Sequence, residues 1–482
     1  MEINRIINAL KNKGLLSKDM DLSLDIEYIS YSSLDICKNT LFVVKGMYFK
    51  EEYLDDAIER GSICYVSEKD YNKSIPCILV KDVEIAMAVI SKCFYKEYDV
   101  ISKIGITGTK GKTTTLNFIK NILECDDKIP AYLSTIDYWT GKRGGKSHNT
   151  TPEVIDIYKC IKDAYLSDIK YLVMEVSSQA YKKHRVYDMK FDMGIFTNIG
   201  CDHISPLEHK DFDEYLSCKL GFLKMCKKIA LYKHIDHYDR IVKELNDREI
   251  ITYGLTKDCD YYISDIKNIN GITSFLVENK MGVRSFSIKM VGSFNVLNAV
   301  SAIIVCDNYN ISYDSIKKGL LETEVLGRMN IFLGDGFKVI VDYAHNYLSA
   351  KAFCSSIKKD FKDCNLKLVF GCPGDRGVNR RHEMAQVSNE YASYVYITME
   401  DPQSKDVLDI SNEIASYLNV PHTIITDRKE AIETAIREAS KNDVIAILGK
   451  GDEDYQIINN SYVPYESDIV VVKEELNKVL EG

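Results

Sequence analysis

The sequence predicts an α/β protein of three domains, and three observations lead to this prediction. The chain has 482 residues, about three times the 150 residues typical of one domain. Short apolar runs typical of buried strands alternate with helical patterns, as in proteins with a mostly parallel sheet. A glycine-rich turn at residues 105–111 joins one of these strands to a helix. We expect domains at residues 1–98, 99–327 and 328–482.

The composition excludes several classes of protein. Apolar residues make up 45% and charged residues 28% of the chain, as in ordinary globular proteins. No apolar run approaches the ~18 residues of a membrane span, and the N-terminal helical pattern lacks the apolar core of a signal peptide. The net charge of −9 argues against a broad basic surface. We therefore expect a cytoplasmic monomer with neither nucleic acid nor membrane as a partner.

The 14 cysteines carry little functional information. They are scattered, and no two form a C-x-x-C pair. This spacing argues against a zinc framework. Without an export signal, reduced thiols are expected, and most of them are predicted to be small core residues.

The first block is predicted to be a small α/β domain. Strands are expected at residues 40–44 and 62–66, with a helix at 51–60 between them. Gly61 follows that helix, where a left-handed closing residue is common. A second helix at 83–95 leads out of the block.

The middle block is predicted to contain a mostly parallel sheet. It opens with a strand at residues 100–106 and a helix from Lys112. Two further buried strands, at 171–174 and 193–196, end in polar residues. Because ligands bind at the carboxyl ends of parallel strands, we expect the site there.

The last block is predicted to be a Rossmann-like α/β domain. It begins near residues 327–330, and helical patterns separate its strands. The expected strands are residues 337–341, 366–370, 394–397 and 444–448.

The sharpest motif is GITGTKGKTTT at residues 105–115. Its glycines let backbone N–H groups face a phosphate at the N-terminus of the following helix. Lys112 is expected to reach the β- and γ-phosphates, and the Thr113 hydroxyl to bind Mg²⁺. The strict pattern has glycine where this chain has Ile106, so the motif is a variant P-loop. Alone it leaves open a kinase, a GTPase-like switch, a motor ATPase or an ATP-dependent ligase.

Three more polar residues are candidates for the same site. Glu175 and His203 each follow a predicted buried strand, and Lys219 lies on a predicted helix at 212–224. Glutamate and histidine are suitable ligands of divalent metals. Taken singly, each residue also suits a purely structural role. Glu175 could cap a helix, His203 could be a structural histidine at a strand end, and Lys219 could be a solvated surface lysine.

Together these segments resemble the Mur ligases, ATP-dependent enzymes that extend the stem peptide of peptidoglycan. The chain looks most like the MurE type, which adds the third residue to UDP-N-acetylmuramoyl-L-alanyl-D-glutamate. The resemblance covers nearly the whole chain. The matching segments are residues 107–114, 149–151, 175–178, 184–186, 196–198, 202–203, 292–298, 326–329, 341–345, 370–376 and 449–453.

The resemblance implies the two substrates ATP and the UDP-muramoyl dipeptide, and positions that hold them. The implied ATP-binding residues are Gly108, Thr109, Lys110, Gly111, Lys112, Thr113, Thr114, Asn295, Asn298, Arg328, Asp342 and His345. The implied residues for the UDP-sugar peptide are Ser33, Asn149, Thr150, Thr151, Ser177, Lys183 and Arg185.

The resemblance also implies catalytic, metal-binding and amino-acid-binding positions. Lys112, Lys219, Glu175 and His203 are implied to be catalytic, and Mg²⁺ would be held by Thr113, Glu175, His203 and Lys219. Lys219 would serve as N6-carboxylysine, because a carbamate is an anion that attracts the metal where an ammonium group repels it. The implied residues for the incoming amino acid are Arg376, Asp401, Gln403, Gly449 and Glu453.

The identity of the incoming amino acid depends on one departure from the family pattern. Relatives that add diaminopimelate carry Asp-Asn-Pro-Arg, whereas residues 400–403 read Glu-Asp-Pro-Gln. A neutral Gln403 lacks the bidentate grip of arginine on a carboxylate, and Glu400 and Asp401 favour an ammonium group. L-lysine or a similar basic amino acid is therefore expected. A solvated acidic loop is the structural alternative for Glu400 and Asp401.

Several functional alternatives stay open from the sequence. The same reaction with diaminopimelate, a folylpolyglutamate-synthase-like ligase and a paralogous Mur ligase all share much of the pattern. A nucleotide-binding regulatory protein without catalysis is the alternative from another class.

Overall fold

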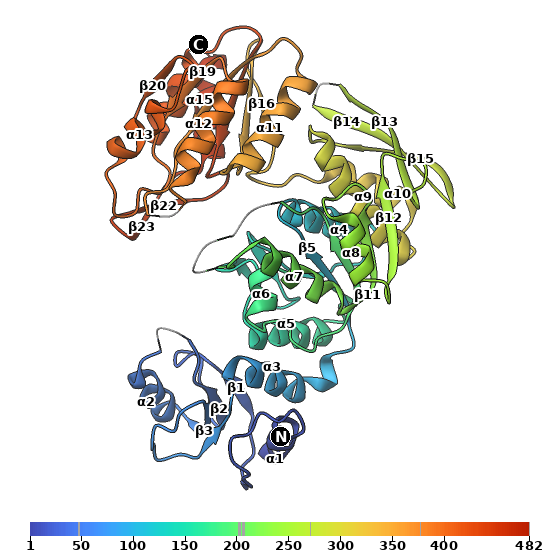
Figure 1. Ribbon diagram of the computed structural model, residues 1–482, viewed down its shortest axis with the longest axis vertical. Coiled ribbons are helices and arrows are strands. Elements are labelled where there is room, and N and C mark those ends of the chain that lie inside the picture. The colour runs from blue at the N-terminus through green and yellow to red at the C-terminus, as the bar shows by residue number, and fades with distance from the viewer. Residues whose placement is uncertain (47–48, 201–203, 205–207, 270, 376, 482) are drawn as a thin grey trace. The chain divides into compact units, whose positions relative to one another are not determined.

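The computed structural model describes residues 1–46, 49–200, 204, 208–269, 271–375 and 377–481. The chain forms two compact units, residues 1–254 with 301–316 and residues 255–300 with 317–482. Strands gather into sheets that follow the three predicted blocks (Figure 1). The fold is α/β with mostly parallel sheets, as predicted. The three boundaries remain a proposal.

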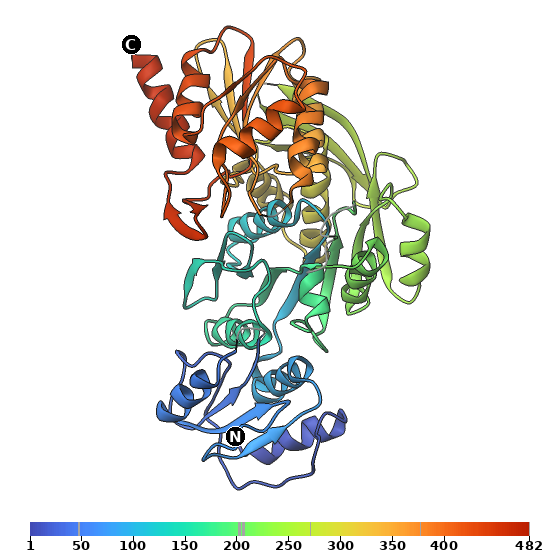
Figure 2. The same ribbon diagram turned by 60° about the vertical axis from the view of Figure 1, so that its left-hand side comes forward.

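The N-terminal block forms a parallel four-stranded sheet in the order β1-β2-β3-β4. Its strands are β1 (Tyr28–Ser30), β2 (Thr40–Val43), β3 (Ser62–Ser67) and β4 (Cys77–Leu79), and its helices are α1 (Ile3–Asn12), α2 (Glu51–Glu59) and α3 (Val83–Phe94), followed by the short η1 (Lys96–Tyr98). The predicted strands and helices are confirmed. Helix α3 packs against α5 of the next block (Figures 1 and 2).

The middle block places the P-loop strand at the centre of a parallel sheet. In the first unit the strand order is β12-β11-β10-β5-β9-β6-β7-β8, and only β7 and β8 run antiparallel to their neighbours. The strands are β5 (Ser102–Thr107), β6 (Ala131–Leu133), β7 (Asp137–Trp139), β8 (Gly144–Lys146), β9 (Tyr171–Glu175), β10 (Phe191–Phe196), β11 (Cys226–Tyr232) and β12 (Glu249–Gly254). The helices are α4 (Lys112–Cys125), α5 (Val154–Leu166), α6 (Ser178–Lys182), α7 (Phe212–Leu223) and α8 (Tyr238–Glu244).

Strand register brings the predicted site residues to one edge of this sheet. Ile106 is paired with Glu175 on one side of β5, and Thr107 with Phe196 on the other. A Cβ atom at Gly105 would lie 2.5 Å from the ring of Phe222 on α7. The glycine thus lets α7 approach β5 closely, which brings the helix that carries Lys219 to the turn.

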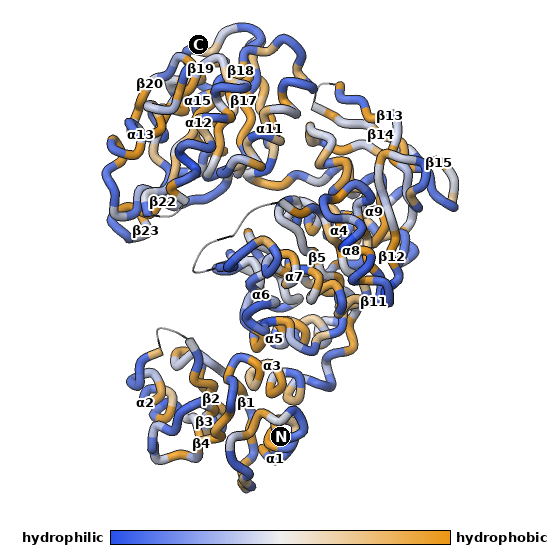
Figure 3. Tube along the Cα trace, viewed as in Figure 1, coloured by the Kyte–Doolittle hydropathy of each residue, from blue (hydrophilic) through white to orange (hydrophobic). Residues whose placement is uncertain are grey.

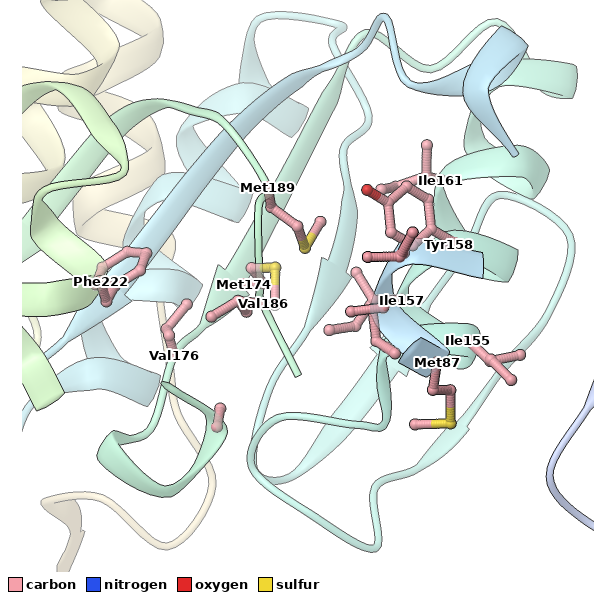
Figure 4. Packing of buried hydrophobic residues seen from close by; sticks show 14 of the residues in the cluster. Met87, Ile155, Ile157, Tyr158, Ile161, Met174, Val176, Val186, Met189 and Phe222 are labelled. Carbon is pink, nitrogen blue, oxygen red and sulfur yellow. The ribbon is translucent and has the colours of Figure 1, made fainter. Parts of the chain in front are cut away.

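Apolar packing holds these elements in place. Figure 4 shows Met174 of β9 close to Val186 and Met189, all of which are buried in the same cluster. Burying side chains of this size contributes about 1.5–3 kcal/mol each. Figure 3 shows the same pattern along the whole chain: apolar residues follow the strands, and polar residues mark many of the connections.

The second unit contains an antiparallel three-stranded segment and a doubly wound sheet. The segment is formed by β13 (Tyr261–Ile269), β14 (Ile272–Asn279) and β15 (Gly282–Ile288). The sheet order is β16-β17-β21-β18-β19-β20, in which only β16 is antiparallel. Its strands are β16 (Asn330–Leu333), β17 (Lys338–Asp342), β18 (Asn365–Phe370), β19 (Tyr394–Ile397), β20 (His422–Ile424) and β21 (Asp443–Leu448).

Helices cover both faces of this second sheet, so the Rossmann-like prediction is confirmed. Along β17, Ile340 packs in one apolar cluster with Phe353, and Val341 packs in another with Ile432 and Val472. The remaining elements are α9 (Ser293–Asn308), α10 (Tyr313–Glu322), α11 (Tyr347–Asp360), α12 (Asn379–Tyr391), α13 (Val407–Ser416), α14 (Arg428–Arg437), α15 (Asp468–Glu481) and the hairpin of β22 (Tyr455–Ile458) and β23 (Ser461–Pro464).

Two expectations about the whole chain also have a structural counterpart. Among the described residues, no helix combines the length and apolar character that a membrane span requires. The cysteines that the structure describes are free thiols, and more than half of them are buried.

Candidate active site

The phosphate-binding turn lies between the end of β5 and the start of α4. Gly108 has a φ of +150°, and a Cβ atom there would lie 1.9 Å from Thr197 Oγ1. Gly111 has a φ of +84° and caps α4. Glycine is therefore required at both positions. The predicted start of the helix at Lys112 is confirmed.

Two lysine side chains converge on the carbonyl oxygen of Gly108. Lys112 Nζ donates to it at 2.9 Å and to Thr109 O at 3.2 Å. Lys219 Nζ donates to the same oxygen at 2.9 Å and lies 4.5 Å from the centre of the Tyr215 ring. Only 2% of Lys219 is exposed, so the alternative of a solvated surface lysine is wrong. The amino groups of two lysines therefore meet where phosphate is expected.

The Glu175 carboxylate lies on the other side of the turn and is fully buried. Thr113 Oγ1 donates to its Oε1 at 2.9 Å, and Thr135 donates to both carboxylate oxygens through its backbone N and its Oγ1, at 2.8 and 2.9 Å. Ser177 is the residue that caps α6, so the alternative role of Glu175 as that cap is wrong.

These oxygen atoms fit a magnesium ion. The Thr113 hydroxyl and the Glu175 carboxylate are the hard oxygen ligands that Mg²⁺ prefers, and this ion usually keeps several waters and binds few protein groups. The described residues contain no cluster of three or more His, Cys, Asp or Glu side chains that could hold a metal. His203, another predicted metal ligand, lies outside the described residues.

Two residues that the sequence analysis left without a role brace the turn from β10. Asn198 Oδ1 accepts from Lys110 N at 2.8 Å, and Asn198 Nδ2 donates to Lys110 O at 3.0 Å. Thr197 Oγ1 donates to the same carbonyl at 2.6 Å. The motif at residues 196–198 was visible in the sequence, but its partner lies 88 residues away, so no local pattern could assign the contact.

Three of the predicted UDP-sugar residues, Thr151, Ser177 and Arg185, form one hydrogen-bonded group at the backbone of Glu175. Thr151 Oγ1 donates to Glu175 O at 2.9 Å and accepts from Ser177 N at 3.0 Å. Arg185 donates to Thr151 O at 2.9 Å and forms an ion pair with Glu153, also at 2.9 Å. This hydrogen-bonded group ties the predicted nucleotide-sugar residues to the strand end that carries Glu175, the candidate metal ligand.

The other predicted UDP-sugar residues are more spread out. Thr150 Oγ1 accepts from Thr135 at 3.2 Å, and Asn149 lines a pocket of about 340 Å³. Ser33 is buried in the loop that follows β1. Lys183 is half exposed and pairs at 3.9 Å with Glu84 at the start of α3. Its ion-pair partner therefore lies outside the hydrogen-bonded group around Thr151.

The wall of this pocket contains polar pairs that the sequence analysis missed. Tyr31 donates to Asp156 at 2.6 Å, and Lys159 Nζ lies 2.5 Å from a carboxylate oxygen of Asp35. Burial raises the pKa of the Tyr31 hydroxyl and of the Asp156 carboxyl. Both pairs join the loop after β1 to α5, which fixes the segment that carries Ser33. The partners lie more than a hundred residues apart, so no spacing signal marks them.

The second unit holds the remaining predicted ATP-binding residues. Asp342 ends β17 and accepts backbone hydrogen bonds from Met329 at 2.9 Å and Ala344 at 2.8 Å. The Arg328 guanidinium lies 4.3 Å from the centre of the Tyr343 ring. Asp342 therefore fixes the backbone on both sides of β17, next to the arginine.

Two asparagines and a histidine complete that set. Asn298 Nδ2 donates to Asn295 Oδ1 at 3.3 Å, and both side chains are buried on α9. His345 Nδ1 lies 2.8 Å from the carbonyl oxygen of Tyr343. These contacts hold the three polar groups at defined positions within the second unit.

Three acidic residues, Glu400, Asp401 and Glu453, lie where the incoming amino acid is expected, and we call them the acidic group. Glu400 is 8% exposed, and burial raises the pKa of its carboxyl to about 7. Asp401 accepts from the buried Lys450 and from Ile457 N, at 2.9 and 3.1 Å. Lys450 also pairs with Glu453 at 2.6 Å. The alternative of a solvated acidic loop is therefore wrong, and Lys450 already compensates the charge of Asp401.

Gln403 is part of the wall of this region. Its Oε1 accepts from Asp375 N at 2.8 Å, its own N–H donates to Ile457 O at 2.9 Å, and it is 7% exposed. The side chain thus ties its loop to the turn before Arg376, which lies outside the described residues. Gly449 leaves room for the Glu400 carboxylate, since a Cβ atom there would lie 2.9 Å from Glu400 Oε2.

Comparisons with known proteins agree with this arrangement. Residues 106–306 match the Mur ligase middle domain, and residues 327–451 match the Mur ligase, glutamate ligase domain. The chain is 39% identical over 455 residues to the UDP-N-acetylmuramoyl-L-alanyl-D-glutamate--L-lysine ligase of Streptococcus thermophilus, covering 93% of each protein. It is 40% identical over 455 residues to the ligase of the same name from Streptococcus agalactiae serotype Ia, covering 93% of this chain and 92% of the relative.

A solved structure is similar over nearly the whole length. It is a UDP-N-acetylmuramoyl-L-alanyl-D-glutamate--2,6-diaminopimelate ligase, with a TM-score of 0.68 and 23% identity over 96% of this chain and 97% of that one. At this identity the likeness concerns the fold alone. The two domain matches, the long relatives and the P-loop geometry agree, and the chain belongs to the Mur ligase family of ATP-dependent ligases.

Proposed function

We propose that this protein adds L-lysine to UDP-N-acetylmuramoyl-L-alanyl-D-glutamate, with ATP as the energy source, in peptidoglycan biosynthesis. The observation that carries the proposal is the convergence of Lys112 and Lys219 on the P-loop carbonyl of Gly108, beside the Thr113–Glu175 pair. The names of the relatives at 39% and 40% identity, both L-lysine ligases, support the choice of substrates.

The first step would activate the substrate carboxylate. The D-glutamyl carboxylate oxygen attacks the γ-phosphorus, the bond to the bridging β–γ oxygen breaks, and ADP leaves an acyl phosphate behind. Lys112 and the N–H groups of the turn would stabilise the negative charge on the transferring group. In the second step the amine nitrogen attacks the acyl carbon, phosphate leaves, and the nitrogen loses a proton. Positioning and electrostatics supply the catalysis in this scheme.

Magnesium and a modified lysine belong to the same proposal. Thr113 and Glu175 would hold Mg²⁺, with His203 as the further ligand named by the family pattern, and the ion would neutralise the polyphosphate. Lys219 would react as a neutral amine with CO₂, forming a carbamate and releasing a proton. Its burial 2.9 Å from the Gly108 carbonyl supports this role, because the carbamate would lie next to the phosphate-binding turn.

The three proposed domains would divide the work. Residues 1–98 would hold the uridine end through Ser33, and residues 99–327 would bind ATP, metal and the dipeptide through the Thr151 and Ser177 group. Residues 328–482 would bring the amino acid, with Arg376 on its α-carboxylate and Glu453 near an amino group. We also propose that the protein is a monomer and is located in the cytoplasm.

The acidic group in the second unit supports a basic amino acid. Asp401 is paired with Lys450, so Glu400 is the carboxylate best placed to meet an ω-ammonium group. A second carboxylate on the substrate, as in diaminopimelate, would be repelled by the ionised form of Glu400.

The test is a phosphate-release assay on the purified protein. Phosphate should appear only when ATP, the UDP-muramoyl dipeptide and L-lysine are all present, and mass spectrometry should detect the UDP-muramoyl tripeptide. Equal turnover without the dipeptide would contradict the proposal. Binding of a folate in place of the UDP-sugar would favour the folylpolyglutamate-synthase-like alternative.

A further inference from the structure

A buried ion pair between Arg428 and Asp468 interacts electrostatically with Glu400 of the acidic group. Arg428, the first residue of α14, is 1% exposed, and Asp468, the first residue of α15, is 0% exposed. Arg428 donates two hydrogen bonds to the Asp468 carboxylate, from Nε to Oδ1 at 2.8 Å and from Nη2 to Oδ2 at 2.7 Å. Tyr465 donates to the same carboxylate at 2.9 Å. Such a pair contributes little net stability compared with apolar side chains of equal size, so its geometry calls for another explanation.

The guanidinium also binds the backbone of two strand ends. Its Nη2 atom donates to the carbonyl oxygen of Leu448 at 2.9 Å, and its Nη1 atom donates to the carbonyl oxygen of Met399 at 3.3 Å. Leu448 is the last residue of β21, and Met399 lies two residues beyond the end of β19. The residues that follow these two carbonyls are Gly449 and Glu400, and a Cβ atom added at Gly449 would lie 2.9 Å from Glu400 Oε2.

We propose that Arg428, held by Asp468, is a positioning residue that sets the spacing of the two loops forming the amino-acid pocket. Arginine suits this role because its planar fork can donate to a carboxylate and to two carbonyls at once, whereas lysine has one point charge. This inference rests on the proposed function, because it assumes that residues 400–403 and 449–453 bind the incoming amino acid.

The electrostatics support the same role. Among the described residues, the charged groups that act on Glu400 include Arg428, Asp401 in its own loop, Arg380 on α12 and Lys450 after β21. The Tyr343 hydroxyl and the Cys372 thiol also interact electrostatically with this carboxylate. Burial raises the pKa of Glu400, and Arg428 is the strongest influence that lowers it. Removing the guanidinium would therefore move the Glu400 carboxyl further towards its neutral form, and an ammonium ligand would lose its anionic partner near neutral pH.

Two variants separate positioning from folding. Arg428→Lys keeps the charge but cannot reach all three partners. The double variant Arg428→Met with Asp468→Leu replaces the pair by apolar side chains of similar size, a change that is often neutral for stability. For both we expect the KM for L-lysine to rise about tenfold or more, the effect of losing a hydrogen bond from a charged donor, while the KM for ATP stays within about twofold.

The pH profile and a matched control complete the test. In the double variant, the pH at which L-lysine affinity is half-maximal should move upwards, whereas Arg428→Lys should leave it closer to the wild type. Asp443→Asn is the control: this buried aspartate pairs with Lys367 at 2.8 Å at the opposite end of β21. It should lower the melting temperature without changing the KM for L-lysine.

The outcomes distinguish the inference from the function on which it rests. If the wild type ligates no amino acid, the proposed function fails. If the wild type ligates L-lysine but the folded variants keep the wild-type KM and pH profile, the positioning role is wrong. Parallel increases in the KM values for ATP and L-lysine would also contradict it, because they would indicate a general structural defect.

Discussion

At the scale of single residues, the candidate site depends on where charge is buried. Lys219 is 2% exposed, and its amino group shares the Gly108 carbonyl with that of Lys112. A glycine-rich turn before a helix presents backbone N–H groups to phosphate. The shared carbonyl therefore places both lysines beside the proposed phosphate position.

We predict that Lys219→Ala abolishes ligation and retains ATP binding. The loss of the carbamate would remove an anion near the metal, whereas Lys112 and the glycine turn would still hold the phosphates. Ligation is measured by phosphate release, ATP binding by calorimetry, and the modification by intact-protein mass spectrometry in bicarbonate. Lys210→Ala, which removes a largely exposed lysine just before α7, is the control and should behave as the wild type. Wild-type turnover by Lys219→Ala would remove this residue from the catalytic set.

We also predict a pH dependence that originates at Glu400. Its pKa is raised to about 7, so the carboxyl is ionised above that pH and becomes neutral as the pH falls through it. The preference for L-lysine over L-norleucine, which lacks the ε-ammonium group, should fall by up to about tenfold for each unit below pH 7. Because both ligands carry the same α-amine, its titration cancels in the ratio. A constant ratio from pH 8 to pH 5.5 would show that Glu400 does not select the ammonium group.

At the scale of elements, the ends of three neighbouring strands build the candidate nucleotide site. Strand β5 supplies the turn, β9 supplies Glu175, and β10 supplies Asn198, which holds Lys110 by two backbone hydrogen bonds. A P-loop must keep its N–H groups aimed inwards before phosphate arrives, and the bracing of the turn from β10 is one way to achieve this.

We predict that Asn198→Ala raises the KM for ATP by about thirtyfold, since two hydrogen bonds of about 1 kcal/mol each are lost. The UDP-muramoyl dipeptide should keep its wild-type KM, because Thr151 and Ser177 are not in this brace. Asn389→Ala is a matched control: that asparagine also makes two backbone hydrogen bonds, to Tyr417 and Asn419, in the second unit. An unchanged KM for ATP in Asn198→Ala would contradict the bracing role.

Regular elements were predictable where buried apolar residues form a continuous run, as in β5, β9, β10 and the main strands of the second sheet. The short strands β1, β4, β6 and β7, of three residues each, were missed. Longer strands such as β11, β13 and β14 were also missed, because exposed or half-buried residues interrupt their buried ones. In the same way, the P-loop residues are contiguous and were predicted, but the contact between Asn198 and Lys110 joins distant positions. The buried pairing of Asp401 with Lys450 was hidden for the same reason, since 49 residues separate them.

At the scale of the whole molecule, a net charge of −9 accompanies substrates that are themselves anionic. The cations that would meet them are therefore local, such as Lys112 in the first unit and Arg328 in the second. On the proposed function, charge alone would not select the amino acid, because selection would depend on the loops at residues 400–403 and 449–453.

Competition between L-lysine, L-ornithine and both diaminopimelate isomers should favour L-lysine, and Gln403→Arg should not reverse this order. Gln403 accepts from Asp375 N through its side-chain carbonyl and is buried. Arginine has no acceptor, so this variant would lose the tie between the two loops and gain no free guanidinium in the pocket. We expect lower L-lysine ligation, by about tenfold for one buried hydrogen bond left unmade, and no diaminopimelate product. Gln403→Glu is the matched control, because its carboxylate can still accept from Asp375 N and should keep most of the L-lysine activity. If Gln403→Arg instead ligates diaminopimelate, residue 403 contacts the substrate directly and its assignment to the wall is wrong.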